Sequence, residues 1–244
     1  TSVGTSAFYN CVNLSEVLLP DSLRSIEYQA FQYCTALTEI IIPESVTSIS
    51  VSAFYGCSNL TKVNIPKNIT TINSYTFYNC SSLKEILIPE RVTQIGSNAF
   101  AGCSALAGIE IPVAVTSIGN GAFNNCNRLA HVFYRGTEAQ KNAISIENYN
   151  TSITDAEWIF ETAWTTLDGA EVCWCENCSR YYHPDGTLAS LNRVEITKLP
   201  EKLRYYTSDV LDLDGIEMTG SYSNGVQVIL GKDDVVSVSV NMAV

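Results

Sequence analysis

A period of 23 residues runs through the first half of the chain and limits what it can fold into. Four residue types recur in one phase: Phe at 8, 31, 54, 77, 100 and 123, Cys at 11, 34, 57, 80, 103 and 126, Leu at 14, 37, 60, 83, 106 and 129, and Pro at 20, 43, 66, 89 and 112. A single unit of this length cannot bury its apolar face alone, whereas stacked units cover one another. The period therefore predicts a solenoid.

The spacing within one unit predicts its local structure. Residues 37–42 read L-x-x-I-x-I, a short strand with its apolar side chains on one face, and Pro43 ends it because proline has no N–H to donate. The β-branched residues 46–49 predict a second short extended segment. Ala30 and Phe31 begin a compact stretch, expected to be 3₁₀ or a single helical turn. Strands of successive units are expected to pair in parallel, with ladders of Phe, Cys, Leu and Ile along the core.

The recurring pattern A-F-x-x-C-x-x-L-x-x-I-x-I-P-x-x-V-T-x-I-G resembles the BspA-like, or Treponema-type, leucine-rich repeats of bacterial surface proteins. The resemblance covers residues 1–134, and Ala-Phe is replaced only by Thr76-Phe77. It implies an extracellular or cell-surface protein of a host-associated bacterium. It also implies adhesion to a protein or glycan on a host or neighbouring cell, without catalysis. Residues 1–4 match the end of a unit, so further repeats or a cap are expected upstream.

Composition excludes several other functions. The formal net charge is −11 and no region is basic, which argues against nucleic-acid partners, since these require Lys and Arg to neutralise phosphate. No apolar run reaches the roughly 18 residues of a membrane span, so direct membrane insertion is not expected. There are two His residues and no recognised catalytic, phosphate-binding or dinucleotide-binding motif. The chain is thus expected to be no enzyme and to need no cofactor.

The outward side of the first strand in each unit is the predicted ligand-binding face. If residues 37, 40 and 42 point inward, residues 39 and 41 and their equivalents point outward. One outward column is then Glu16, Glu39, Lys62, Glu85, Gly108 and His131, and the other is Leu18, Ile41, Asn64, Leu87, Glu110 and Phe133. Exposed apolar rows commonly mark interaction sites. The open alternative is that this row packs against a neighbouring domain.

The six repeat cysteines occupy a phase next to Phe and Leu that must be buried. We expect them to be buried free thiols that act as small hydrophobic residues. Stacked neighbours point in parallel, while a disulfide needs converging side chains.

Residues 135–165 are predicted to cap the array. Residues 137–144 read as a short helix with Thr137 as its N-cap, and residues 156–160 as a strand. Trp158 and Phe160 are expected to shield the last repeat.

Residues 166–192 form a predicted Cys-containing hairpin linker. Cys175 and Cys178 have the C-x-x-C spacing of half a zinc ribbon, with Cys173 and His183 as further candidate ligands. One such pair is not specific, and zinc, a local disulfide and free thiols all remain open.

Residues 193–244 alternate polar and apolar side chains and contain the turn signal Ser223-Asn224-Gly225. Together with Leu-Asp-Leu-Asp-Gly-Ile at 211–216, this region is similar to bacterial Ig-like domains, in an incomplete copy. The predicted fold class is therefore mainly β: a leucine-rich-repeat solenoid of 23-residue repeats with parallel strands, then an antiparallel Ig-like domain. A structural spacer or stalk that presents another domain is the alternative to adhesion, and an accessory region of a larger enzyme is a third possibility.

Overall fold

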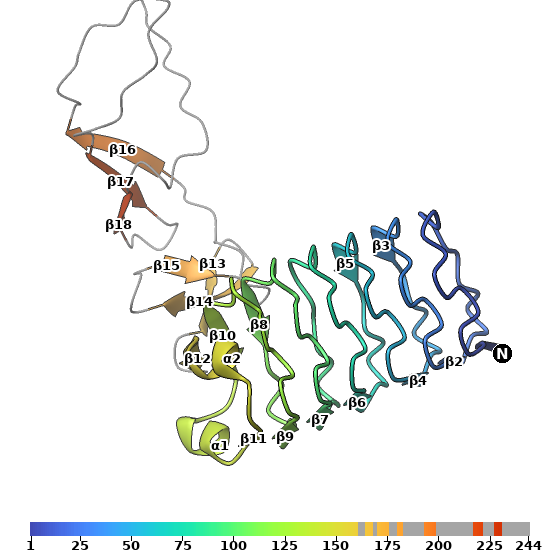
Figure 1. Cartoon of the computed structure of the whole chain (residues 1–244). Helices are drawn as coiled ribbons and strands as arrows, with labels where there is room; N and C mark the ends of the chain where they lie inside the picture. The colour runs from blue at the N-terminus through green and yellow to red at the C-terminus, as the bar shows by residue number, and fades with distance from the viewer. Residues whose placement is uncertain are drawn as a thin grey trace, which may run out of the picture.

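In the computed structural model, residues 1–160 are described throughout, followed by the backbone of six strands between residues 164 and 230. The repeats coil into a stack with the N-terminus at one end (Figure 1). Each coil brings two short extended segments onto two columns that run along the stack. Both columns have the parallel pairing and the 23-residue register that the repeat predicts.

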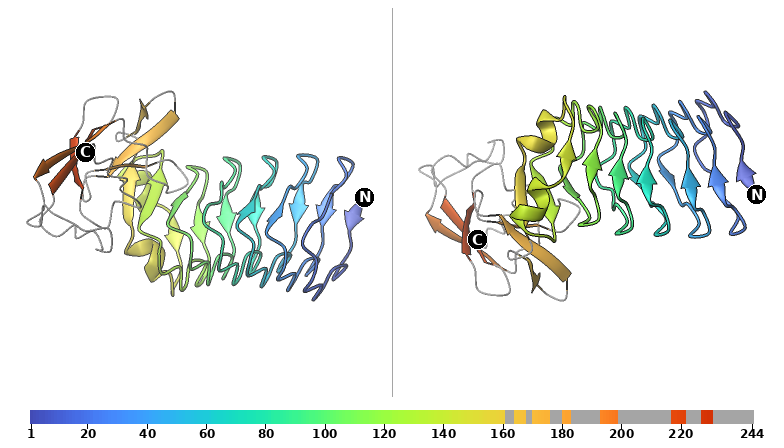
Figure 2. Two further views of the ribbon diagram at one scale, coloured as in Figure 1. Left: turned by 90° about the horizontal axis from the view of Figure 1, so that it is seen from above. Right: turned by 90° about the horizontal axis from the view of Figure 1, so that it is seen from below.

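The column of second segments is the more continuous one. It contains β1 (Ser2–Val3), β2 (Ser25–Ile26) and β4 (Ser48–Ile49), and then β6 (Thr71–Ile72), β7 (Gln94–Ile95), β9 (Ser117–Ile118) and β11 (Ser145–Ile146). The sheet orders are β1-β2-β4 and β11-β9-β7-β6. Seen from below, these strands follow one another along the stack (Figure 2). The Ile of each of the five inner strands is buried in the core, as period-two alternation requires, whereas Val3 and Ile146 of the end strands are partly buried.

The column of first segments becomes more regular toward its C-terminal end. It contains the pair β3 (Glu39–Ile40) and β5 (Lys62–Val63), then β8 (Gly108–Glu110), β10 (His131–Tyr134) and β12 (Glu157–Phe160). A single parallel bridge joins Leu87 to Glu110.

Six phenylalanine rings form one continuous stack through the core. Neighbouring ring centroids lie 5.1 to 5.6 Å apart, with interplanar angles between 3° and 17°. The backbone N–H of each Phe except Phe123 donates to a carbonyl in the next coil, as in Phe31 N to Ala53 O at 2.8 Å. The predicted Phe ladder is confirmed.

Five of the six repeat cysteines are buried free thiols, as expected. Each donates its S–H to the Phe carbonyl of the preceding coil, for example Cys57 Sγ to Phe31 O at 3.1 Å. Cys11, in the first coil of the described residues, is instead exposed. Burial raises the pKa of Cys34 to about 11 and that of Cys57 to about 12, so these thiols stay protonated.

The segment around each Phe is a chain of turns and not the expected 3₁₀ or helical turn. Two positions in each coil have positive φ, for example Gln29 (55°) and Tyr33 (61°), with Gly56 (71°) in the next coil at the phase of Tyr33. A left-handed residue stops a right-handed helix from continuing. The chain therefore reverses direction within a few residues and drops Phe into the core.

The helix and the strand predicted within residues 135–165 are both present. Helix α1 (Glu138–Asn142) starts at Thr137, whose side chain forms a capping box with Gln140. A second short helix, α2 (Thr151–Thr154), precedes β12. Trp158 and Phe160 pack on the core, and both rings contact the ring of Tyr134 edge-on.

Two antiparallel sheets follow the cap. The first contains β13 (Trp164–Leu167), β14 (Ala170–Cys175) and β15 (Arg180–Tyr182), and the second β16 (Arg193–Lys198), β17 (Glu217–Ser221) and β18 (Gln227–Leu230). Strand β14, which contains Cys173 and Cys175, pairs antiparallel with β15, and the hairpin linker over 166–192 stays a prediction. The second sheet is antiparallel as expected, but the residues between its strands lie outside the described part, and Ig-like remains a prediction.

Candidate recognition surface

The first-strand column exposes large apolar side chains in the N-terminal part of the array. Leu18 is 88%, Ile41 76% and Leu87 66% exposed. Their neighbours in sequence turn inward, and Ile40 and Ile42 belong to the core. The expected outward ridge is therefore present from residue 18 to residue 87. We call Leu18, Ile41 and Leu87 the apolar ridge.

Asn64 interrupts the apolar ridge and has a structural role. Its side-chain amide accepts from Ile42 N and donates to Ile42 O, both at 2.7 Å. The side-chain amide thus links two neighbouring coils by a pair of hydrogen bonds, just beyond the residues where β3 and β5 pair.

Two grooves lie along the apolar ridge. One, of about 630 Å³, is lined by Leu18 and Ile41 together with Glu16 and Glu39. The other, of about 590 Å³, lies beside Leu87 and carries a charged rim: Glu44, Lys67, Glu90 and Arg91. Apolar surface flanked by charges of both signs is typical of protein interfaces.

The C-terminal end of the predicted face is not exposed. Phe133 is 0% exposed, and Gly108, Glu110 and His131 are also buried. Here the column has become a sheet of β8, β10 and β12, and strand β14 of the following sheet lies next to β12. The exposed part of the predicted face therefore ends at Leu87. Of the other column, Glu16, Glu39 and Lys62 are exposed and Glu85 is half-buried.

Glu110 is a buried carboxylate held by an ion pair. The Arg135 Nε atom lies 2.6 Å from Glu110 Oε1, and the arginine is the more exposed partner. Burial of a charged carboxylate is tolerated because the guanidinium compensates it.

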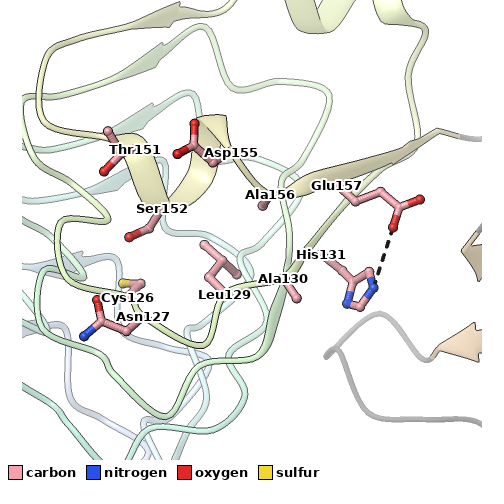
Figure 3. Close-up of a pocket in the computed structure, with 10 residues that line it drawn as sticks. All are labelled: Cys126, Asn127, Leu129, Ala130, His131, Thr151, Ser152, Asp155, Ala156 and Glu157. Carbon is pink, nitrogen blue, oxygen red and sulfur yellow. Dashed lines mark ion pairs between the residues drawn. The ribbon is translucent and has the colours of Figure 1, made fainter. Parts of the chain in front are cut away.

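His131 lines a shallow hollow of about 650 Å³ between the last repeat and the cap (Figure 3). Its Nε2 atom lies 3.8 Å from Glu157 Oε2. Burial lowers the pKa of His131, while the nearby Glu157 opposes that shift to a smaller extent. Cys126, beneath the hollow, has a pKa raised to about 12 by burial, so it is a protonated thiol and a poor nucleophile.

The proposed zinc ligands fall partly outside the described residues. Cys178 and His183 lie there, and of Cys173 and Cys175 only the backbone, on β14, is described. Over residues 1–160 no group of three His, Cys, Asp or Glu side chains is placed to hold a metal ion. In the same part of the chain, no helix has the length and apolar character needed to cross a membrane.

Comparison with known families agrees with the repeat geometry. Six copies of the BspA type leucine rich repeat region match residues 1–130. The chain belongs to this family. No curated protein matches it significantly. The matched region ends before the hairpin and the predicted Ig-like segment.

Two solved structures support the assignment of the BspA-type repeats. A leucine-rich cell surface protein of Faecalibacterium prausnitzii is 42% identical, with a TM-score of 0.51 over 52% of this chain and 34% of its own. The leucine-rich-repeat protein of T. pallidum is 31% identical, with a TM-score of 0.53 over 61% of this chain and 78% of its own. The chain thus spans about a third of the Faecalibacterium protein.

Proposed function

We propose that this BspA-type array is a non-catalytic recognition module at the bacterial cell surface, and that it binds its partner through the apolar ridge. The exposure of Leu18, Ile41 and Leu87 on one column is the observation that carries this proposal. Family membership supports a surface role, and the name of the Faecalibacterium relative describes a cell surface protein.

A protein partner fits the apolar ridge better than a glycan does. Large aliphatic side chains bury well against other apolar groups, and the rim of Lys67, Arg91 and Glu44 can set the orientation of a charged partner. The ridge runs along the stack, as expected of solenoids that bind through extended surfaces.

Introducing a charge on the apolar ridge tests the proposal. The 244-residue chain would be assayed by surface plasmon resonance against fibronectin, collagen and mucin, together with Leu87→Glu and Ile41→Glu. Each variant places an uncompensated charge in the interface, and we expect about a hundredfold weaker binding, because burying an unpaired charge costs several kcal/mol.

The matched control is Gln94→Glu, which adds the same charge at an exposed position of β7, on the other column. It should bind as the parent does. Equal loss in the control and in Leu87→Glu would show that overall charge, and not the ridge, matters. Absence of binding to every protein tested would favour the spacer function.

A further inference from the structure

A cluster of tyrosines lies on a different side of the stack from the apolar ridge. It is formed by the turns that follow the second strand of each coil and contains Tyr9, Tyr33, Tyr55, Tyr75 and Tyr78. The rings form a continuous chain of contacts, with neighbouring centroids 4.6 to 6.4 Å apart. We call these five residues the tyrosine surface.

The tyrosine surface is partly open to solvent. Tyr9 is 48% and Tyr75 38% exposed, and the other three rings are half-buried. The cluster spans the first four coils and ends where Ala101 and Asn124 replace the tyrosines of the equivalent positions. It is therefore a bounded patch and not a feature of every repeat.

The backbone leaves room for the tyrosine rings to lie close to one another. Gly56 has φ +71°, and a Cβ there would lie 2.5 Å from Tyr33 Cδ1, so the absence of a side chain leaves room for the Tyr33 ring. Burial, and then a hydrogen bond with Tyr33, raises the pKa of Tyr55 to about 12. The hydroxyl of Tyr55 is thus neutral at physiological pH and can both donate and accept.

The surroundings of the rings are polar but almost uncharged. Glu27 is the one charged residue in the six equivalent turns, 4–12, 27–35, 50–58, 73–81, 96–104 and 119–127. The remaining polar residues there are mostly Asn, Ser and Gln. This contrasts with a chain whose formal net charge is −11.

We propose that the tyrosine surface binds a neutral polysaccharide. A pyranose ring has C–H groups on its faces and hydroxyls on its edge. Tyrosine offers an apolar ring for the first and a hydroxyl for the second. Neighbouring Asn and Ser side chains supply further donors and acceptors for sugar hydroxyls. A polymer of repeating sugars also suits aromatic groups repeated from coil to coil.

Other classes of ligand fit less well. A nucleic acid also stacks on aromatic rings, but it requires Lys and Arg for its phosphates, and the turns contain neither. Protein hot spots combine tyrosine with arginine and aliphatic anchors. The apolar ridge, and not the tyrosine surface, has that composition.

Affinity gel electrophoresis of the 244-residue chain tests this inference. Native gels would contain laminarin, galactomannan or xylan as neutral probes, with dextran sulfate as a charged comparison. At least one neutral polysaccharide should retard the chain, and dextran sulfate should not. Isothermal titration with oligosaccharides of the retarding polymer would then measure the affinity.

Two tyrosine variants and two controls assign the binding to this surface. Tyr75→Ala and the double variant Tyr55→Ala/Tyr78→Ala should each weaken binding about tenfold or more, a loss of ~1.4 kcal/mol. Tyr75→Ala is included because its ring is exposed and its removal leaves the core intact. Tyr149→Ala, at an exposed tyrosine of the cap, and Leu87→Glu, on the ridge, should bind as the parent does.

The proposal would be overturned if none of the three neutral polymers retarded the chain, or if Tyr75→Ala and the double variant both bound as the parent does. It would also be overturned if these variants lost binding to a protein while no polysaccharide bound. Because the apolar ridge lies on the first-strand column and the tyrosine surface lies on the turns after the second strand, the response of Leu87→Glu separates failure here from failure of the ridge.

Discussion

Asn150 replaces, at the end of the stack, a backbone group that every inner coil receives from its neighbour. Phe100 N donates to Ala122 O, but Phe123 has no such carbonyl ahead of it. The side chain of Asn150 accepts from Phe123 N at 3.0 Å and donates to Gly119 O at 2.9 Å. One buried amide thus satisfies polar groups that the end of the array would leave unpaired.

Asn150→Ala should therefore destabilise the chain by about 1–3 kcal/mol, the penalty of leaving a buried N–H without a partner. Urea unfolding followed by circular dichroism would measure the change in the free energy of unfolding. Asn148→Ala is the control, because Asn148 contributes its backbone carbonyl and not its side chain to the cap. An unchanged midpoint for Asn150→Ala would mean that water replaces the amide.

The buried thiols predict how stability depends on pH. Their pKa is raised in the folded state, to about 12 for Cys57 and Cys126. Unfolded thiols ionise near pH 8.5. Below that pH the thiols are protonated in both the folded and the unfolded chain, and their contribution to the free energy of unfolding is complete. Above it the thiols of the unfolded chain ionise first, which favours unfolding. Stability should fall between about pH 8.5 and pH 12.

Urea midpoints measured across this pH range test the expected slope. Replacing the fully buried Cys80 by alanine removes one such thiol and should make the alkaline decline shallower. Parallel declines for parent and Cys80→Ala would rule out the thiols as its source.

At the scale of the coil, the phenylalanine stack connects each inner repeat to two others. Phe77 is fully buried between Phe54 and Phe100, while Phe8 is half-buried and stacks on Phe31 alone. Removing an inner ring leaves a cavity and breaks two stacking contacts.

Phe77→Ala is expected to lower the free energy of unfolding by about 3–5 kcal/mol, the usual range for a buried phenylalanine. Phe8→Ala should lower it by less, because that ring has one neighbour and retains solvent contact. Urea denaturation of both variants makes the comparison. Similar losses would show that the rings are not coupled through the stack.

Part of the repeat structure could be predicted from the sequence, and part could not. The 23-residue phase predicted the parallel register and the Phe and Cys ladders, because each follows from a local pattern repeated many times. The helix at Thr137 lies outside the repeats and was predicted from its N-cap residue alone. The burial of Phe133 and His131 could not be predicted this way, since it depends on packing at the end of the array and beyond the repeat. The turns were misread as helical because left-handed φ at Gln29 and Tyr33 is unusual for these residue types.

Sequence patterns also missed the tyrosine surface. Its members come from three different positions of the repeat, so they do not form one column in the sequence. The available signal was compositional: turns rich in Tyr, Asn and Ser with one charged residue among them.

At the scale of the whole molecule, stability is expected to vary along the stack. In nearest-neighbour arrays, each unit depends on those that it contacts. Val3, Phe8 and Leu14 of the first coil are only partly buried, whereas the equivalent residues of the inner coils are in the core. In the 244-residue chain, the coil that contains these residues should therefore open more often than the middle of the array.

Amide hydrogen exchange followed by mass spectrometry would show this gradient in the 244-residue chain. Peptides from residues 5–20 should exchange faster than those from residues 75–120. The exchange rates of the cap should be close to those of residues 75–120, because Asn150 bonds to the last repeat and Trp158 packs on the core. Uniform exchange along the array would mean that it opens only as one cooperative unit.

The unvarying register of the ladders has a consequence for the history of such chains. Every inner coil meets its neighbours with the same ring, thiol and carbonyl in the same places. A duplication or deletion of 23 codons would therefore create no new kind of junction. The gene could lengthen or shorten by whole coils, and a ligand-binding side could be extended without redesigning the interior.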